Sequence, residues 1–164
     1  MRKIMTLLVF CSMLSACSKA ETFETLGQIQ HQQTLAPALA TVQLSLPDSA
    51  AAQTFGSGME GMYDCDGYTV LVQTFSSGDF TSTVQNLSGF SPDKLTVMES
   101  SVADVKRYDW VWTAAGEEGD MLCRASVLDD GNYHYCLCTV APADQAGALS
   151  AEWSRLFGSF RLEQ

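Results

Sequence analysis

Residues 105–140, VKRYDWVWTAAGEEGDMLCRASVLDDGNYHYCLCTV, decide the fold of this chain. They divide into three runs of strand-forming residues, 105–114, 120–128 and 133–140. The two segments between them are rich in glycine, aspartate and glutamate, which is typical of turns. The sequence therefore predicts an antiparallel meander of three strands at the centre of the domain.

Shorter apolar runs on both sides of the meander predict further strands. Four of them precede it in the sequence, and Phe160 with Leu162 favours a short closing strand after it. The four upstream runs are residues 41–46, 59–64, 68–75 and 95–99.

Two segments show helical periodicity instead. Over residues 78–88, Phe80, Val84 and Leu87 recur at i, i+4 and i+7, and Gly89 can close the helix.

Residues 143–157 carry the second helical pattern. Asp144 favours the N-terminus of this helix and Gly158 ends it. Its apolar stripe consists of Leu149, Trp153, Leu156 and Phe157.

A helix with one apolar stripe has to bury that stripe against another element. The sequence therefore predicts an α+β fold, a mostly antiparallel sheet with two main helices packed on it. The meander, the Ala-Pro-rich start of the late helix and the terminal Ser159-Phe160-Arg161-Leu162 resemble bacterial lipoproteins of the PsbP-like α/β/α sandwich class. This resemblance extends over most of residues 40–164 and implies a binding or assembly module. The resemblance assigns no catalytic residue to this sequence.

The N-terminus has the three parts of a secretory signal. Arg2 and Lys3 provide a positive start, residues 4–14 are mostly apolar, and the small residues Ser15 and Ala16 follow. A membrane-spanning helix needs about 20 apolar residues, so this run is too short to be one.

Leu14-Ser15-Ala16-Cys17 resembles a lipobox, the motif that the bacterial lipoprotein-processing enzymes recognise. The resemblance implies that residues 1–16 are removed as a signal peptide and that Cys17 receives a diacylglycerol thioether. Two acyl chains give stable membrane anchoring. We therefore expect a tether over residues 17–40 and a single domain over 41–164, held outside the cytoplasm. Ser18 in place of aspartate permits an outer-membrane as well as a cell-membrane location.

The composition of the chain limits the classes of partner that it can bind. The chain is 46% hydrophobic, which is a globular composition. Without residues 1–16 it has seven basic and 19 acidic residues, a formal charge of −12. Nucleic acid and bare anionic lipid require basic patches, and no such run follows Cys17. The expected contact with the membrane is through the lipid alone.

Four cysteines fall in the predicted domain, where an exported protein can keep disulfides. If Asp130-Gly131 is a two-residue hairpin loop, the register places Cys123 opposite Cys138. The preferred pairing is then Cys123–Cys138 with Cys65–Cys136. A three-residue loop would shift that register, and in a reducing habitat the thiols would stay free.

A metal site is the alternative use of the same region. His134, Cys136 and Cys138 share one strand face, and Cys123 is expected nearby. Zinc sites more often use Cys residues separated by two to four positions on turns, so a partly exposed strand histidine is the favoured interpretation of His134. No metal or other cofactor is predicted.

Signals for catalysis are weak. A serine-type hydrolase would depend on His134, and the G-x-S-x-G elbow is absent from the sequence. Tyr108, Trp110 and Trp112 share one face of the strand over residues 105–114. They are candidate ligand-facing aromatics, but packing beneath a helix is the favoured interpretation because large aromatics dominate cores.

These observations lead to a membrane-anchored envelope lipoprotein that is not an enzyme. We expect a binding or assembly module that presents a sheet face or loop edge to an envelope protein or a small ligand. The alternatives are a small hydrolase or metal-binding protein that uses Cys123, His134, Cys136 and Cys138, and a purely structural lipoprotein.

Overall fold

The computed structural model describes residues 36–53, 60–102 and 104–163. The predicted signal peptide, the lipobox with Cys17 and most of the predicted tether lie outside these residues. From Pro37 onward the described residues form one compact unit. No helix among them is long and apolar enough to cross a membrane.

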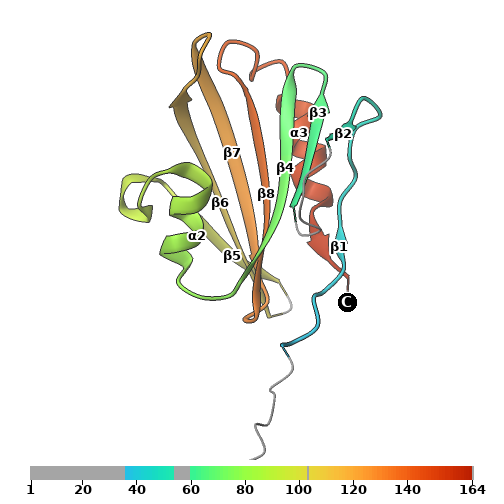
Figure 1. The fold of residues 1–164 in the computed structure, drawn as a ribbon, viewed down its shortest axis with the longest axis vertical. Helices are drawn as coiled ribbons and strands as arrows, with labels where there is room; N and C mark the ends of the chain where they lie inside the picture. Colours follow the sequence, from blue (N-terminus) through green and yellow to red (C-terminus); the bar gives the residue numbers. More distant parts are fainter. Residues whose placement is uncertain (1–35, 54–59, 103, 164) are drawn as a thin grey trace, which may run out of the picture. The chain divides into compact units, whose positions relative to one another are not determined.

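The centre of the domain is a seven-stranded sheet in which every neighbouring pair is antiparallel (Figure 1). Its order is β2-β3-β4-β8-β7-β6-β5. The strands are β2 (Ala51–Gln53), β3 (Glu60–Cys65), β4 (Tyr68–Ser76), β5 (Met98–Val102), β6 (Val105–Ala115), β7 (Asp120–Asp129) and β8 (Tyr133–Pro142). The predicted meander is confirmed as β6-β7-β8.

Two short strands form a separate pair beside this sheet. β1 (Val42–Gln43) is antiparallel to β9 (Arg161–Leu162), with Val42 opposite Leu162 and Gln43 opposite Arg161. The predicted strand over residues 41–46 is thus reduced to two residues. The pairing brings the start and the end of the domain together.

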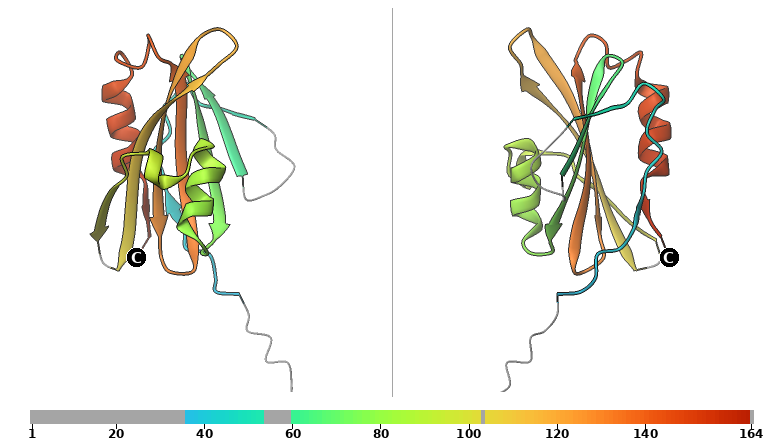
Figure 2. Two further views of the ribbon diagram at one scale, coloured as in Figure 1. Left: turned by 90° about the vertical axis from the view of Figure 1, so that its left-hand side faces the viewer. Right: turned by 45° about the vertical axis from the view of Figure 1, so that its right-hand side comes forward.

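The helices cover opposite faces of the sheet, which confirms the predicted sandwich (Figure 2). α2 (Phe80–Ser88) begins after Asp79, whose carboxylate accepts a hydrogen bond from the Thr81 N–H at 3.0 Å. Gly89 closes it with a φ of 76°, as the sequence predicted. A 3₁₀ turn, η1 (Pro92–Lys94), then leads towards β5.

α3 (Ser150–Ser159) is shorter at its start than the helix predicted over residues 143–157. Residues 143–149 form turns instead, with Ala148 N–H bonded to the Gln145 carbonyl. Gly147 lies inside this segment, and glycine disfavours a helix interior by about 1 kcal/mol. The helix continues through Gly158 to Ser159 rather than ending there.

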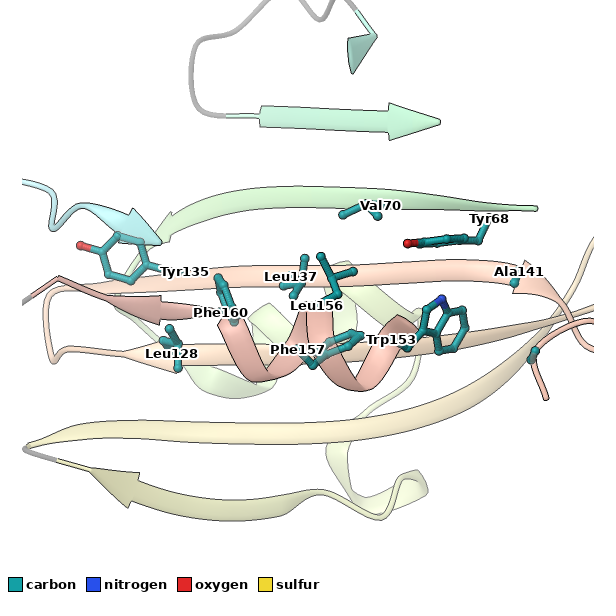
Figure 3. Close-up of a cluster of buried hydrophobic side chains, with 11 residues drawn as sticks. Tyr68, Val70, Leu128, Tyr135, Leu137, Ala141, Trp153, Leu156, Phe157 and Phe160 are labelled. Atoms are coloured by element: carbon teal, nitrogen blue, oxygen red, sulfur yellow. The ribbon is translucent and has the colours of Figure 1, made fainter. Parts of the chain in front are cut away.

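The larger core lies between α3 and the sheet (Figure 3). Trp153, Leu156 and Phe157 of α3, together with Phe160, are at most 4% exposed. Each buried apolar side chain of this size contributes about 1.5–3 kcal/mol relative to an exposed one. The sheet residues that meet them include Tyr68, Val70, Leu128, Tyr135 and Leu137.

The second core lies between α2 and the other face of the sheet. Val84 packs there against Trp110, Trp112 and the cysteines of β7 and β8. Trp110 is 1% and Trp112 8% exposed, so the ligand-facing interpretation of these aromatics is corrected. They pack beneath the helix, and the Tyr108 ring contacts Phe80 at a centroid distance of 4.1 Å.

Candidate functional site

A buried polar group lies beneath α2 and contains the one histidine that the structure describes. His134 of β8 is 1% exposed, not partly exposed as the sequence suggested. Its Nδ1 lies 2.7 Å from the Thr83 hydroxyl of α2, and its Nε2 lies 3.7 Å from an Asp129 carboxylate oxygen. The negative carboxylate favours a proton on Nε2, so the Thr83 hydroxyl donates to Nδ1.

This hydroxyl–imidazole–carboxylate order resembles a nucleophile triad in its chemistry. A nucleophile must reach substrate, and Thr83 is 4% exposed. The ring of Phe80 closes over His134 at right angles, with centroids 6.1 Å apart. The group is therefore a polar link that joins α2 to the sheet.

The register of the β7–β8 hairpin differs from the predicted one. Asp129 pairs with His134, and residues 130–132 connect β7 to β8 instead of the predicted two-residue loop Asp130-Gly131. The reason is Asp130, whose carboxylate accepts from the N–H groups of Asn132 at 2.8 Å and Tyr133 at 2.7 Å. Cys123 consequently lies opposite Val140, not opposite Cys138.

This register corrects the predicted disulfides. Cys123 and Cys138 are diagonal neighbours on the α2 face, and diagonal Cα atoms lie about 7–8 Å apart, beyond the usual disulfide range. Cys65 packs against the α3 core, whereas Cys136 belongs to the α2 core, so the sheet separates them. All four thiols are free.

The three thiols beneath α2 have the character of core residues. Burial, together with neighbouring Cys123, raises the pKa of the Cys138 thiol to about 12. Burial also raises the pKa of Cys136 strongly, and neighbouring Cys138 adds to this effect. A neutral thiol is a poor nucleophile and a poor metal ligand.

The alternative metal site is not assembled. Within the described parts of the chain, no three His, Cys, Asp or Glu side chains are placed to hold a metal ion. Cys136 and Cys138 point to one face of an extended strand, so their sulfurs follow the strand instead of converging on one point.

A concavity lies elsewhere, on the α3 face of the sheet. It is an open hollow of about 690 Å³ between β1, β9, the end of α3 and the edge of the sheet. Its apolar lining comprises Val102, Val105, Leu128, Phe160 and Leu162. This lining contains no serine, threonine, cysteine, histidine or lysine.

Polar groups form the rim of this hollow. Gln43 accepts a hydrogen bond from Arg161 Nε at 2.6 Å and donates to Glu163 at 2.9 Å. Asp130 also lines it. An apolar centre within a polar rim is the usual anatomy of a protein-binding surface.

Arg107 fixes the floor of the hollow. Its guanidinium donates to both carboxylate oxygens of Asp109, at 2.8 and 3.2 Å. It also donates to the carbonyls of Phe157 at 3.0 Å and Phe160 at 3.3 Å. It therefore ties the end of α3 to β6, and four of its five N–H donors are used in these contacts.

Sequence reasoning missed this hollow, because its walls come from positions more than 100 residues apart. One sequence feature could have indicated it. Arg107 and Asp109 are two residues apart and so share one strand face, and a charged pair on a half-buried face needs hydrogen-bond partners. The partners are helix-end carbonyls, which leave no trace in the sequence.

Comparison with known proteins shows the fold. No family model matches the chain, and no curated protein matches it. The solution structure of a cyanobacterial PsbP from Synechocystis sp. PCC 6803 superposes with a TM-score of 0.55 at 10% identity, over 77% of this chain and 95% of that one. LpqN of Mycobacterium tuberculosis, described as involved in cell envelope biogenesis, gives 0.51 at 10% identity, over 78% and 86%.

The Ran-binding protein Mog1p of Saccharomyces cerevisiae is also similar, with a TM-score of 0.49 at 12% identity, over 74% of this chain and 89% of that one. At these identities the first two likenesses establish the PsbP-like sandwich. A shared fold does not transfer a function.

Proposed function

We propose that this protein is a lipid-anchored, non-catalytic binding module of the bacterial cell envelope, and that its hollow receives an apolar segment of an envelope protein. The observation that carries the proposal is the hollow itself, which combines an apolar floor, a polar rim and a lining without a nucleophile. His134, on which a serine-type hydrolase would depend, is 1% exposed beneath α2.

The envelope location rests on the lipobox-like Leu14-Ser15-Ala16-Cys17. The fold shared with LpqN, which is described as involved in cell envelope biogenesis, supports the location by analogy. Ala40 lines the hollow, so the chain that leads back to Cys17 departs from that end of the domain.

Site-specific photo-cross-linking in the native host tests the proposal. A photoreactive residue at position 161, on the rim, should form a discrete product with one envelope protein. The same residue at exposed position 118, in the β6–β7 turn, should not.

A pair of near-isosteric variants makes this test specific. Val105→Thr places a hydroxyl in the hollow and should lower the yield of the product, since burying a hydroxyl without a partner is costly. Val111→Thr is the control, on the same face of β6 but outside the hollow. Equal yields from both variants, or turnover of an envelope substrate by the purified protein, would refute the proposal.

A further inference from the structure

β5 is an exposed edge of the seven-stranded sheet. It pairs with β6 on one side, and no strand among the described residues occupies the other. All five of its residues are exposed, with Met98 at 64% and Val102 at 76%. Natural sheet edges are usually blocked by proline, lysine, a bulge or extreme shortness. The opposite edge, β2, has only three residues, whereas β5 has five, with no proline or lysine and with Glu99 as its one charged side chain.

The hairpin register identifies which backbone groups of β5 are free. Val102 pairs with Val105, and Asp104 between them has a left-handed φ of 64°. The pair that closes a two-residue loop is hydrogen-bonded, and hydrogen-bonded pairs then alternate along the ladder. Met98, Ser100 and Val102 therefore bond to β6, while Glu99 and Ser101 point their N–H and C=O groups outward.

The strand sequence Met98-Glu99-Ser100-Ser101-Val102 is complementary to itself about Ser100. If a second copy is antiparallel with its Ser100 opposite this one, Glu99 faces Ser101 of the second copy, and each such pair exchanges two hydrogen bonds. Met98 then faces Val102 of the second copy, both on the α3 side of the sheet. This is a non-hydrogen-bonded pair, where cross-strand side chains approach most closely.

Charge supports the same register. Lys106 lies beside Ser101 on β6, so it stands in line with Glu99 of the second copy on the α2 side of the sheet. A two-residue shift in one direction would place two Glu99 side chains opposite each other, and like charges directly opposite are destabilising. A two-residue shift in the other direction would place Ser101 opposite Ser101, and either shift would leave only three of the five β5 residues overlapping. A one-residue shift would place Glu99 or Ser101 opposite Ser100 of the second copy. The N–H and C=O groups of Ser100 point towards β6, so they could not pair with those of either residue.

We propose that this chain forms a two-fold symmetric dimer in which β5 pairs antiparallel with β5 of a second copy, centred on Ser100. The two sheets then become one continuous sheet. Met98 of the second copy lies beside Val102, which lines the hollow, so each copy contributes to the rim of the other's hollow.

The dimer is expected to be weak in solution. A single five-residue edge buries much less than the roughly 1,200–2,000 Å² of a standard stable interface. Both copies are also acidic and repel each other. Confinement to a membrane raises the effective concentration of tethered partners without any new contact, so the test belongs in membranes.

Cysteine cross-linking of the full chain in membranes of an expression host tests the register. In Ser100→Cys the two new thiols lie at the two-fold axis, with Cα atoms about 4.5 Å apart, within disulfide range. A mild oxidant should therefore produce a disulfide-linked dimer on a non-reducing gel. Ser101→Cys is the matched control, equally exposed on the same strand, but its two copies lie too far apart to bridge.

A second variant separates edge pairing from random collision. Ser101→Pro removes an outward N–H, which an edge strand tolerates, so the monomer should unfold at an unchanged temperature. Ser100→Cys combined with Ser101→Pro should lose at least about nine-tenths of the cross-link. In each copy the Ser101 N–H donates one hydrogen bond to the Glu99 carbonyl of the other copy, and the proline removes both of these bonds from the dimer. Equal cross-linking of the two single cysteines, no cross-link from either, or a cross-link that survives the proline would overturn the proposal.

Discussion

The two faces of the seven-stranded sheet carry helices of similar length that are held in different ways. α3, with ten residues, buries Trp153, Leu156 and Phe157, whereas α2, with nine, buries only Thr83 and Val84. The α3 face is held by large apolar side chains and by Arg107 at the helix end. The α2 face is held by the buried Val84, by the partly buried Phe80 and Leu87, and by one buried hydroxyl–imidazole hydrogen bond.

The difference shows how a short helix can be positioned with little apolar area. Beneath α2 the sheet itself provides the bulk, with Trp110 and Trp112 stacked at a centroid distance of 6.2 Å. The helix therefore needs a specific polar contact to fix its position. We expect the two faces to respond differently to apolar and polar substitutions.

The largest expected effect is on the α3 face. Phe157→Ala should lower the free energy of unfolding by about 3–5 kcal/mol, because it leaves a cavity in the larger core. Val84→Ala on the α2 face should cost less, at about 2 kcal/mol, since it removes only two methyl groups. Urea unfolding measures both, and an equal loss would contradict the comparison.

The next largest loss of stability is expected from removing the Thr83–His134 hydrogen bond, the polar link between α2 and the sheet. Thr83→Val preserves shape but leaves His134 Nδ1 buried without a donor, which should cost about 1–3 kcal/mol. Thr83→Ser keeps the hydroxyl and is the control, with a smaller loss. If the two variants were equally stable in urea, the hydrogen bond would not be what positions α2.

Alkaline pH should weaken the α2 face through its thiols. The folded pKa of Cys138 is raised from 9.0 to about 12, so its stabilising contribution is complete below pH 9 and is lost as the pH rises towards 12. Cys138→Ala should therefore show a shallower decline in the free energy of unfolding between pH 8 and 10 than the unchanged chain. Parallel declines in urea titrations would argue against this interpretation.

The smallest effect is expected on the part of the α3 side that no helix covers. Met98 is 64% exposed, so Met98→Thr should change the free energy of unfolding by no more than about 0.5 kcal/mol. In the Ser100→Cys background it should nevertheless reduce dimer cross-linking, because Met98 meets Val102 of the second copy. A large stability loss by urea unfolding would show that Met98 supports the single chain instead.

Periodicity predicted most of the fold. Alternation and turn residues identified the meander, and helical spacing identified the segments of both helices. β2 was missed because Ala51–Gln53 is short, exposed and mostly alanine, so its pairing comes from β3 and not from its own residues. α3 begins later than Asp144 suggested because Gly147 disfavours a helix interior, so residues 143–149 form turns.

The site was less predictable because its contacts are long-range. The Asp130 side chain reset the hairpin register, and with it the expected cysteine pairing. His134 was interpreted without its partner Thr83, which lies 51 residues earlier. Packing of aromatics under a helix was favoured correctly, since it follows from residue type alone.

The pairing of β1 with β9 makes this domain a natural candidate for circular permutation. Val42 and Leu162 are opposite each other, so a short linker could join the two ends. The chain could then be reopened in the Gly116–Gly119 turn, which lies at the other end of β7 from the hollow. A segment attached at the new N-terminus would then leave the domain from the end opposite the hollow.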